Sequence, residues 1–182
     1  MEWARTLRID AAPSDALEQR LRRSFAHEGI KLSLRGSQAP SRTYALVEGP
    51  PGLDPAEIDW STCGARAFDE PVIALAIEPA PSDALPFLQS ALSGEGAPAG
   101  VLGCEIAGER IVVEFAPSVT PAPLVMRLID VELARFAGNR KVELLSPLSL
   151  ETYTQIAAQG LSCEEIVPQR VLEALIGGAH VG

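Results

Sequence analysis

The chain has 182 residues, enough to bury one large or two small hydrophobic cores without disulfide bonds. Its formal net charge of −9 argues against nucleic acid as a partner, because phosphate binding depends on clustered Lys and Arg. No apolar run approaches the roughly 20 residues needed to cross a bilayer. The first residues lack the layout of a secretion signal and the cysteines number only three, so we expect a cytoplasmic protein without membrane contact.

The charge is distributed unevenly along the chain. Residues 1–42 carry eight basic and five acidic side chains, a net charge of +3, which leaves −12 for residues 43–182. The two parts could therefore attract each other or another subunit.

The first element in chain order is half of an internal repeat. Residues 9–17 (IDAAPSDAL) recur at 77–85 (IEPAPSDAL), with seven identities and one exchange of acid for acid at an offset of 68. Each copy reads as the end of a strand that leads through a Pro-Ser-Asp helix start into a leucine. This pattern indicates a duplicated structural unit and helix-start chemistry rather than an active-site motif.

The first copy occupies residues 1–69 and is predicted to have a shortened second half. Asp54–Trp60 can form only two helical turns, and Gly64–Phe68 is a weak strand. The expected elements before these are strand Trp3–Ile9, helix Asp15–His27, strand Ile30–Leu34 and a strand that contains Thr43–Val47.

The second copy occupies residues 70–147 and contains the complete βαββαβ series. The expected elements are strand Pro71–Glu78, a short helix capped by Asp83, strands Val101–Ile106 and Arg110–Phe115, a helix from Thr120 to Ala137 and strand Lys141–Leu145. Residues 148–182 are expected to form a helical pair. We predict an α+β fold of tandem duplicated ferredoxin-like units with antiparallel sheets, followed by this C-terminal extension.

The cysteines give no metal-binding pattern. Cys63, Cys104 and Cys163 form no CxxC pair, and no histidine lies at ligand spacing from them, so neither metal nor cofactor is predicted. Cys104 alternates within a strand as a core residue would. Cys63 lies in an expected loop and is the best candidate nucleophile, but an incidental loop thiol is the favoured interpretation because a nucleophile needs a positioned base.

A basic stripe on the first helix is the other candidate site. Arg20 and Arg23 are followed by His27 at helical spacing, which would suit an anion or carboxylate ligand. The competing interpretation is a solvated helix face on which Glu18 pairs with Arg22 at i,i+4. Together with Cys63 these residues are the ligand-binding candidates.

Acidic residues on the predicted hairpin allow two further interpretations. Glu105, Glu109 and Glu114 could gather with Asp130 and Glu132 into a hydrolytic or divalent-metal site. The simpler expectation is that they form the solvent-facing side of strands whose other side is buried.

No catalytic constellation emerges, so the sequence favours a non-catalytic assembly, scaffold or regulatory protein that acts through contacts with a protein partner or a second copy. The alternative is a small-molecule-binding or enzymatic α+β barrel with a pocket between sheet and helices. RNA binding on an open sheet face would need exposed aromatics, for which Tyr44 and Phe115 are the available strand residues, and it ranks last.

Overall fold

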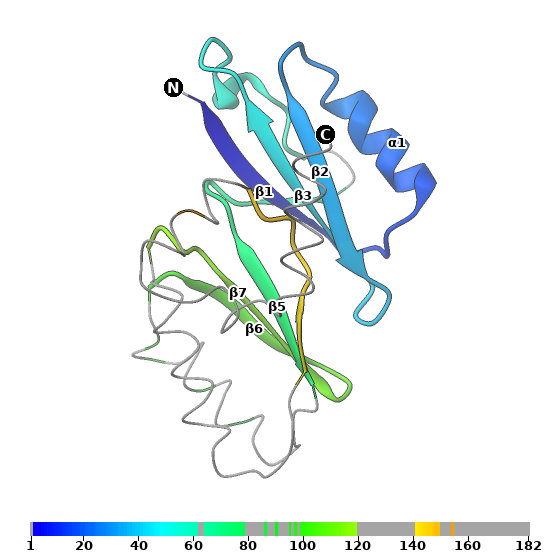
Figure 1. The fold of residues 1–182 in the computed structure, drawn as a ribbon, viewed down its shortest axis with the longest axis vertical. Helices are drawn as coiled ribbons and strands as arrows, with labels where there is room; N and C mark the ends of the chain where they lie inside the picture. Colours follow the sequence, from blue (N-terminus) through cyan, green and yellow to red (C-terminus); the bar gives the residue numbers. More distant parts are fainter. Residues whose placement is uncertain are drawn as a thin grey trace. The chain divides into compact units, whose positions relative to one another are not determined.

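The computed structural model describes residues 2–61, 64–78, 99–119 and 141–149, together with the single positions 86, 90, 95, 97 and 154. They form a mixed α+β protein with two four-stranded antiparallel sheets (Figure 1). The chain divides into two compact units: unit 1 is Met1–Val72 with Leu145–Pro147, and unit 2 is Ile73–Leu144 with Leu148–Gly182.

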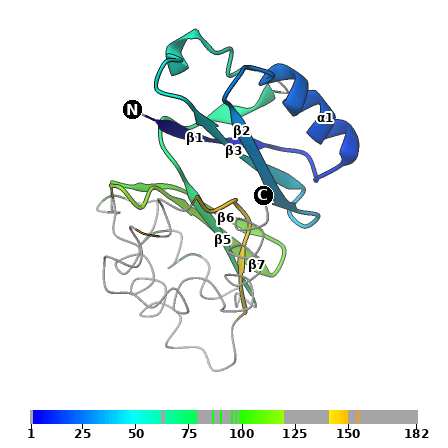
Figure 2. The ribbon, with the colours of Figure 1, turned by 45° about the horizontal axis from the view of Figure 1, so that its top comes forward.

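Unit 1 has the strand order β2-β3-β1-β4, with all neighbours antiparallel, and the antiparallel sheet predicted from the sequence is thereby confirmed. Helix α1 covers one face of this sheet (Figures 1 and 2). The elements are β1 (Trp3–Ile9), α1 (Asp15–Ser24), β2 (Lys31–Ser37), β3 (Arg42–Gly49), the 3-10 helix η1 (Pro55–Glu57) and β4 (Arg66–Ala67).

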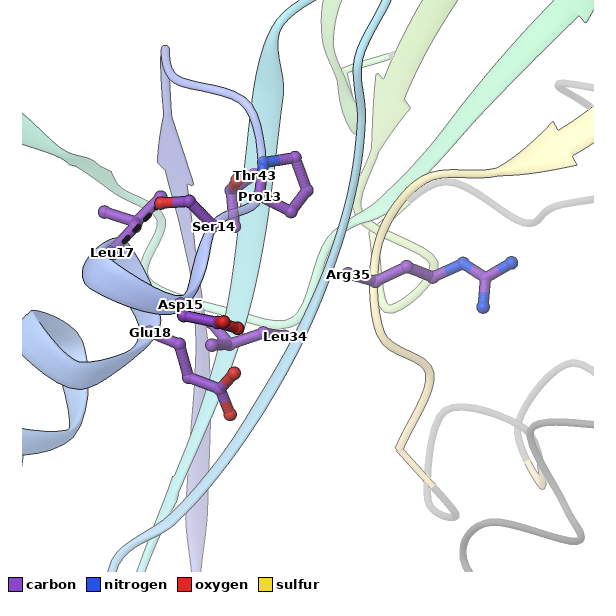
Figure 3. Close-up of a pocket in the computed structure, with 8 residues that line it drawn as sticks. All are labelled: Pro13, Ser14, Asp15, Leu17, Glu18, Leu34, Arg35 and Thr43. Atoms are coloured by element: carbon purple, nitrogen blue, oxygen red, sulfur yellow. Dashed lines mark hydrogen bonds between the residues drawn. The ribbon is translucent and has the colours of Figure 1, made fainter.

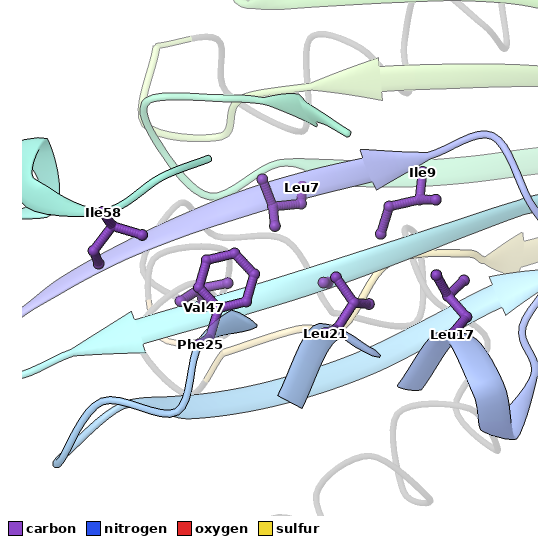
Figure 4. Packing of buried hydrophobic residues seen from close by; sticks show 8 residues of the cluster. Leu7, Ile9, Leu17, Leu21, Phe25, Val47 and Ile58 are labelled. Carbon is purple, nitrogen blue, oxygen red and sulfur yellow. The ribbon is translucent and has the colours of Figure 1, made fainter. Parts of the chain in front are cut away.

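The core of unit 1 lies between α1 and the sheet (Figure 4). Leu17, Leu21 and Phe25 recur every four residues, so they share one face of the helix. The sheet contributes alternate residues of its two central strands, because successive side chains of a strand point to opposite faces. These are Leu7 and Ile9 from β1 and Ala45 and Val47 from β3, with Ile58 closing the end of the core.

The first helix is shorter than the sequence predicted. It ends at Ser24 rather than at His27, and Phe25 is its C-cap. Residues beyond Phe25 form a turn in which the Ile30 N–H donates to the His27 carbonyl at 3.2 Å. Gly29 adopts φ +84°, a left-handed conformation that glycine tolerates and that turns the chain into β2. The stretch predicted as the last helical turn is therefore used as the connection.

The shortened second half of the first copy is confirmed. In place of two helical turns there is only the three-residue η1, whose N-cap Asp54 accepts a hydrogen bond from Ala56 N at 2.9 Å. The final strand β4 has two residues and pairs with β1 at Leu7 and Arg8.

Unit 2 repeats the strand order of unit 1, as β6-β7-β5-β8. Its strands are β5 (Ile73–Glu78), β6 (Val101–Ala107), β7 (Arg110–Phe115) and β8 (Lys141–Leu144). The first and third strands of the two units also share their register: Ile9 pairs with Thr43 in unit 1, and Ile77 pairs with Ile111 in unit 2. Both pairs are related by the offset of 68, so the repeat in the sequence is also a repeat of strand pairing.

An ion pair recurs at the same offset and explains the exchange of acid for acid in the motif. Arg42 Nε lies 3.6 Å from Asp10 Oδ1 in unit 1, and Arg110 Nε lies 3.6 Å from Glu78 Oε2 in unit 2. The acid directly follows the first strand in unit 1 and is its last residue in unit 2, and in both units the arginine begins the third strand. Arg110 also bonds to Glu143 on β8, so its guanidinium links three strands of its sheet.

The expectation that the hairpin carboxylates all face solvent was wrong for Glu114, which is only 2% exposed. Its strand β7 is flanked by β6 and β5, where its partners are the small residues Gly103 and Ala74. A Cβ on Gly103 would lie 2.7 Å from Glu114 Oε1, so the glycine leaves room for the carboxylate. The proposed companions Asp130 and Glu132 lie outside the described residues.

Several predicted elements also lie outside the described residues. They are the short helix capped by Asp83, the helix from Thr120 to Ala137 and the C-terminal helical pair. The strand predictions of both copies are confirmed, with ends that differ by up to three residues.

We expect Leu21→Ala to destabilise unit 1 by about 2–5 kcal/mol, because it removes a fully buried side chain from the only helix that packs on the described part of this sheet. Denaturation followed by tryptophan fluorescence reports on this unit, since both tryptophans of the chain, Trp3 and Trp60, belong to it. The matched control is Arg23→Ala on the exposed side of α1, which should change stability by less than about 0.5 kcal/mol. Equal effects of the two variants would show that the helix does not supply the core.

Candidate functional site

A pocket of about 270 Å³ lies within unit 1, at the N-terminal end of α1 where the helix faces β2 and β3 (Figure 3). Its lining comes from the β1–α1 connection, the first turn of α1 and the two strands. The lining residues are Pro13, Ser14, Asp15, Leu17, Glu18, Leu34, Arg35 and Thr43.

The helix start forms one wall of the pocket. Ser14 is extended, with φ −152° and ψ 158°, and its Oγ accepts a hydrogen bond from Leu17 N at 3.1 Å. This is an N-cap, which satisfies one of the N–H groups that a helix leaves without an internal acceptor. Leu17 is 7% exposed and belongs to the core. The cap at Ser14 and the burial of Leu17 together fix the position of the first turn of α1.

The opposite wall is held by contacts between the β1–α1 connection and the strands. The Thr43 hydroxyl donates to the Ala11 carbonyl at 2.8 Å and so ties the connection to β3. Gly36 lets the connection approach β2, because a Cβ at that position would lie 2.7 Å from Pro13 Cγ and against the Arg42 carbonyl oxygen. The pocket is thus bounded on one side by the capped start of α1 and on the other by the contacts of the β1–α1 connection with β2 and β3.

The charged groups of the pocket are mainly acidic. Asp15 and Glu18 leave the first turn of α1 on the side toward β2, whereas the Arg35 side chain points away from the helix (Figure 3). Glu18 Oε1 lies 2.9 Å from Arg22 Nη2, so this carboxylate has a cationic neighbour. The lining includes no His, Cys or Lys, and its polar side chains are the two carboxylates, the hydroxyls of Ser14 and Thr43, and Arg35.

The residues predicted from the sequence lie elsewhere. Arg20 and Arg23 are exposed on α1, and His27 is exposed in the turn beyond the helix, so the three do not share one helix face. The Glu18–Arg22 pair expected for a solvated face is present. Cys63 lies outside the described residues, and ligand binding by these four residues stays a prediction.

The pocket residues were present in the sequence as the Pro-Ser-Asp element of the repeat. That element was interpreted as a helix start, which the structure confirms for Ser14. Its second role was missed because Leu34 and Thr43 complete the pocket from strands that follow later in the chain. These residues come together because β2 and β3 pair in the same sheet as β1, which leads into α1.

The remaining candidate residues can be judged only where the structure describes them. Within the described ranges no three His, Cys, Asp or Glu side chains are grouped so that they could hold a metal ion. Tyr44 and Phe115 are both fully buried and cannot stack on a base. Among the helices that the structure describes, none has the length and apolar character needed to cross a membrane.

Fold and pocket together describe a mixed α+β protein with a small pocket at the start of α1, lined by two carboxylates and one arginine among its charged side chains. No protein-family model matches the chain, and no curated protein matches it. Among the solved structures that are similar is the ligand-free regulatory subunit of aspartate kinase from Thermus thermophilus, at 17% identity, over 71% of this chain and 91% of that chain. Its TM-score is 0.30, and at this level the likeness carries no argument about function.

Ser14→Ala should destabilise unit 1 by about 1 kcal/mol, because the Leu17 N–H loses its acceptor at the start of α1. Ser14→Asp should largely retain stability, since a carboxylate also caps a helix N-terminus. Urea denaturation monitored by tryptophan fluorescence measures both effects. If Ser14→Ala and Ser14→Asp were equally destabilised, the hydrogen bond to Leu17 would not be the stabilising contact.

Cys104 should react slowly with iodoacetamide. Burial raises the pKa of its thiol to about 11, and the negative charge of Glu105 acts in the same direction. At pH 8 the thiolate fraction is then about 0.1%, roughly two orders of magnitude below that of an unperturbed thiol. Mass spectrometry of the Cys104 peptide measures the rate, and the same reaction in 6 M guanidinium is the control, where fast alkylation should return. Fast alkylation of the folded protein would contradict the burial of this thiol.

Proposed function

We propose that the protein is a non-catalytic regulatory protein that binds a small organic molecule in the pocket of unit 1. The observation that supports this most strongly is the pocket itself, in which apolar side chains and a few polar groups converge at the end of a helix. Ligand sites in proteins combine these two features. The volume of about 270 Å³ lies just below the range of about 300–1,000 Å³ for drug-sized ligands, which favours a small metabolite.

The chemistry of the lining supports binding rather than turnover. Carboxylates and hydroxyl groups can orient a ligand through hydrogen bonds. The hydroxyls of Ser14 and Thr43 are already engaged with the backbone, which fixes their positions but uses part of their hydrogen-bonding capacity. A rigid site of this kind selects a ligand by shape and polarity.

Assembly through protein contacts is the second candidate, and β6 favours it. This seven-residue strand lies at one edge of the unit 2 sheet, and Ile106 on it is 44% exposed. An edge strand with an exposed apolar side chain is a common point of contact for another chain. Light scattering after size-exclusion chromatography tests this candidate, and a protein that stays monomeric and retains no partner would contradict it.

We propose tandem ferredoxin-like units with limits at 1–69, 70–147 and 148–182, the last being the helical extension. The shared strand order and the shared register of first and third strands support the duplication. A soluble, cytoplasmic location remains the expectation from the sequence.

The ligand proposal predicts that at least one compound in a library of small metabolites raises the unfolding temperature of unit 1. A ligand present at 100 times its Kd stabilises the folded state by about 2.7 kcal/mol. The tryptophan signal of unit 1 measures the shift. Absence of any stabilising compound would contradict the proposal.

A pair of variants tests whether the ligand that raises the unfolding temperature binds in the pocket. Leu34→Trp narrows the pocket and should abolish the shift, whereas Leu32→Trp lies on the same face of β2, packs on the core and does not line the pocket. A ligand that stabilises both variants equally would bind elsewhere.

A further inference from the structure

The cavity at the start of α1 has a polarity that narrows the class of ligand. We propose that its ligand is a small molecule with a cationic nitrogen, held by Asp15 and Glu18, and with a hydrocarbon part that contacts Pro13, Leu17 and Leu34. The inference rests on the proposed function, since it names the chemical class that the same pocket would bind.

The two carboxylates are placed so that one ligand group can contact both. Asp15 and Glu18 are three residues apart on α1, so they are neighbours on the helix surface, with Cβ atoms about 5–6 Å apart. Both line the cavity and lie on the side of the helix that faces Leu34 (Figure 3). A protonated amine or a guanidinium has several N–H donors and can bond to two such acceptors at once.

The sign of the local charge is set by side chains rather than by the helix. The N-terminus of a helix acts as about half a positive charge, which alone would favour an anion. Here each of two carboxylates carries a full negative charge, and Arg22 neutralises only Glu18. Within the described part of the chain Asp15 has no cationic partner, and the Arg35 side chain is directed away from the cavity (Figure 3). An anionic ligand would therefore face an uncompensated carboxylate.

Two of the three polar residues, Glu18 and Thr43, are absent from the repeat, whereas Asp15 recurs as Asp83. Because the register of the first and third strands is the same in both units, Ile111 occupies in unit 2 the position of Thr43 in unit 1. The same offset of 68 places Pro86 at the position of Glu18. The repeat keeps the helix-start letters Pro-Ser-Asp but not this acid or this hydroxyl. The combination of Asp15, Glu18 and Thr43 is thus particular to the pocket of unit 1.

Three probes with one hydrocarbon skeleton test the charge preference: isoamylamine, isoamyl alcohol and isovalerate. Binding to the full-length protein is measured by tryptophan-monitored unfolding and by NMR titration at low salt. The amine should bind at least tenfold more tightly than the alcohol, and isovalerate should bind more weakly than either. Raising the salt concentration should weaken the binding of the amine, because the carboxylates are near the surface.

Asp15→Asn is the decisive variant, since it keeps the size of the side chain and removes its charge. It should lower the affinity for the amine about tenfold and leave the alcohol unchanged. Glu28→Gln is the matched control, an exposed acid of the same unit that does not line the cavity, and it should change neither affinity. An amine affinity that Asp15→Asn and Glu28→Gln reduce equally would overturn the proposal.

The outcomes separate this inference from the proposed function. If the library yields a ligand that Leu34→Trp excludes but that carries no cationic nitrogen, the pocket stands and the charge preference is overturned. If isovalerate binds as tightly as the amine, the charge preference is likewise overturned. If neither probes nor library give any ligand of the pocket, both proposals fail.

Discussion

The antiparallel pairing of the first and third strands is the constraint on which the rest of each unit depends. In unit 1 it places Leu7 beside Ala45, and this pair forms part of the floor on which Leu17 and Leu21 of α1 are buried. The helix can lie only where its apolar face meets that floor. Since β1 leads directly into the helix start, the pairing also fixes the connection that carries Ser14 and Asp15. The pocket is a consequence of this geometry, because the connection must pass from the centre of the sheet to the helix above it.

The same pairing explains what the internal repeat preserves. Ile9 and Ile77 occupy matching register positions, and the acid that follows each of them pairs with the arginine that begins the third strand. In each pair the acid is open to solvent and the arginine is largely buried, and an ion pair with a solvent-exposed partner typically contributes about 0–1 kcal/mol. Its value here is geometric, since it joins the end of one strand to the start of its partner. The two units therefore share their strand pairing and the Pro-Ser-Asp element, while the sequence positions of Glu18 and Thr43 in the unit 1 pocket correspond to Pro86 and Ile111 in unit 2.

The sequence predicted those features that depend on local pattern. The bounds of Trp3–Ile9 and the Ser-Asp helix start follow from alternation and capping, which act over a few residues. It failed where distant residues decide the outcome. Glu114 is buried between β6 and β5, where the small residues Gly103 and Ala74 flank it in the sheet.

The candidate site shows the same division between local and distant information. Arg20, Arg23 and His27 drew attention as a charged stripe, yet they are exposed and His27 lies beyond the helix. The pocket instead unites the repeat motif with Leu34 and Thr43, which no spacing rule connects to it. Ligand binding by the charged stripe stays a prediction, whereas the Pro-Ser-Asp element lies at a position where the tertiary fold forms a cavity.

The most direct test of the account is a chemical-shift map of the backbone amides with a bound small-molecule ligand. The account predicts that the perturbed amides cluster in residues 13–18, 34–35 and 43, the segments that line the cavity. Perturbations centred on Arg20, Arg23 and His27, or spread over unit 2 with the start of α1 unchanged, would contradict it.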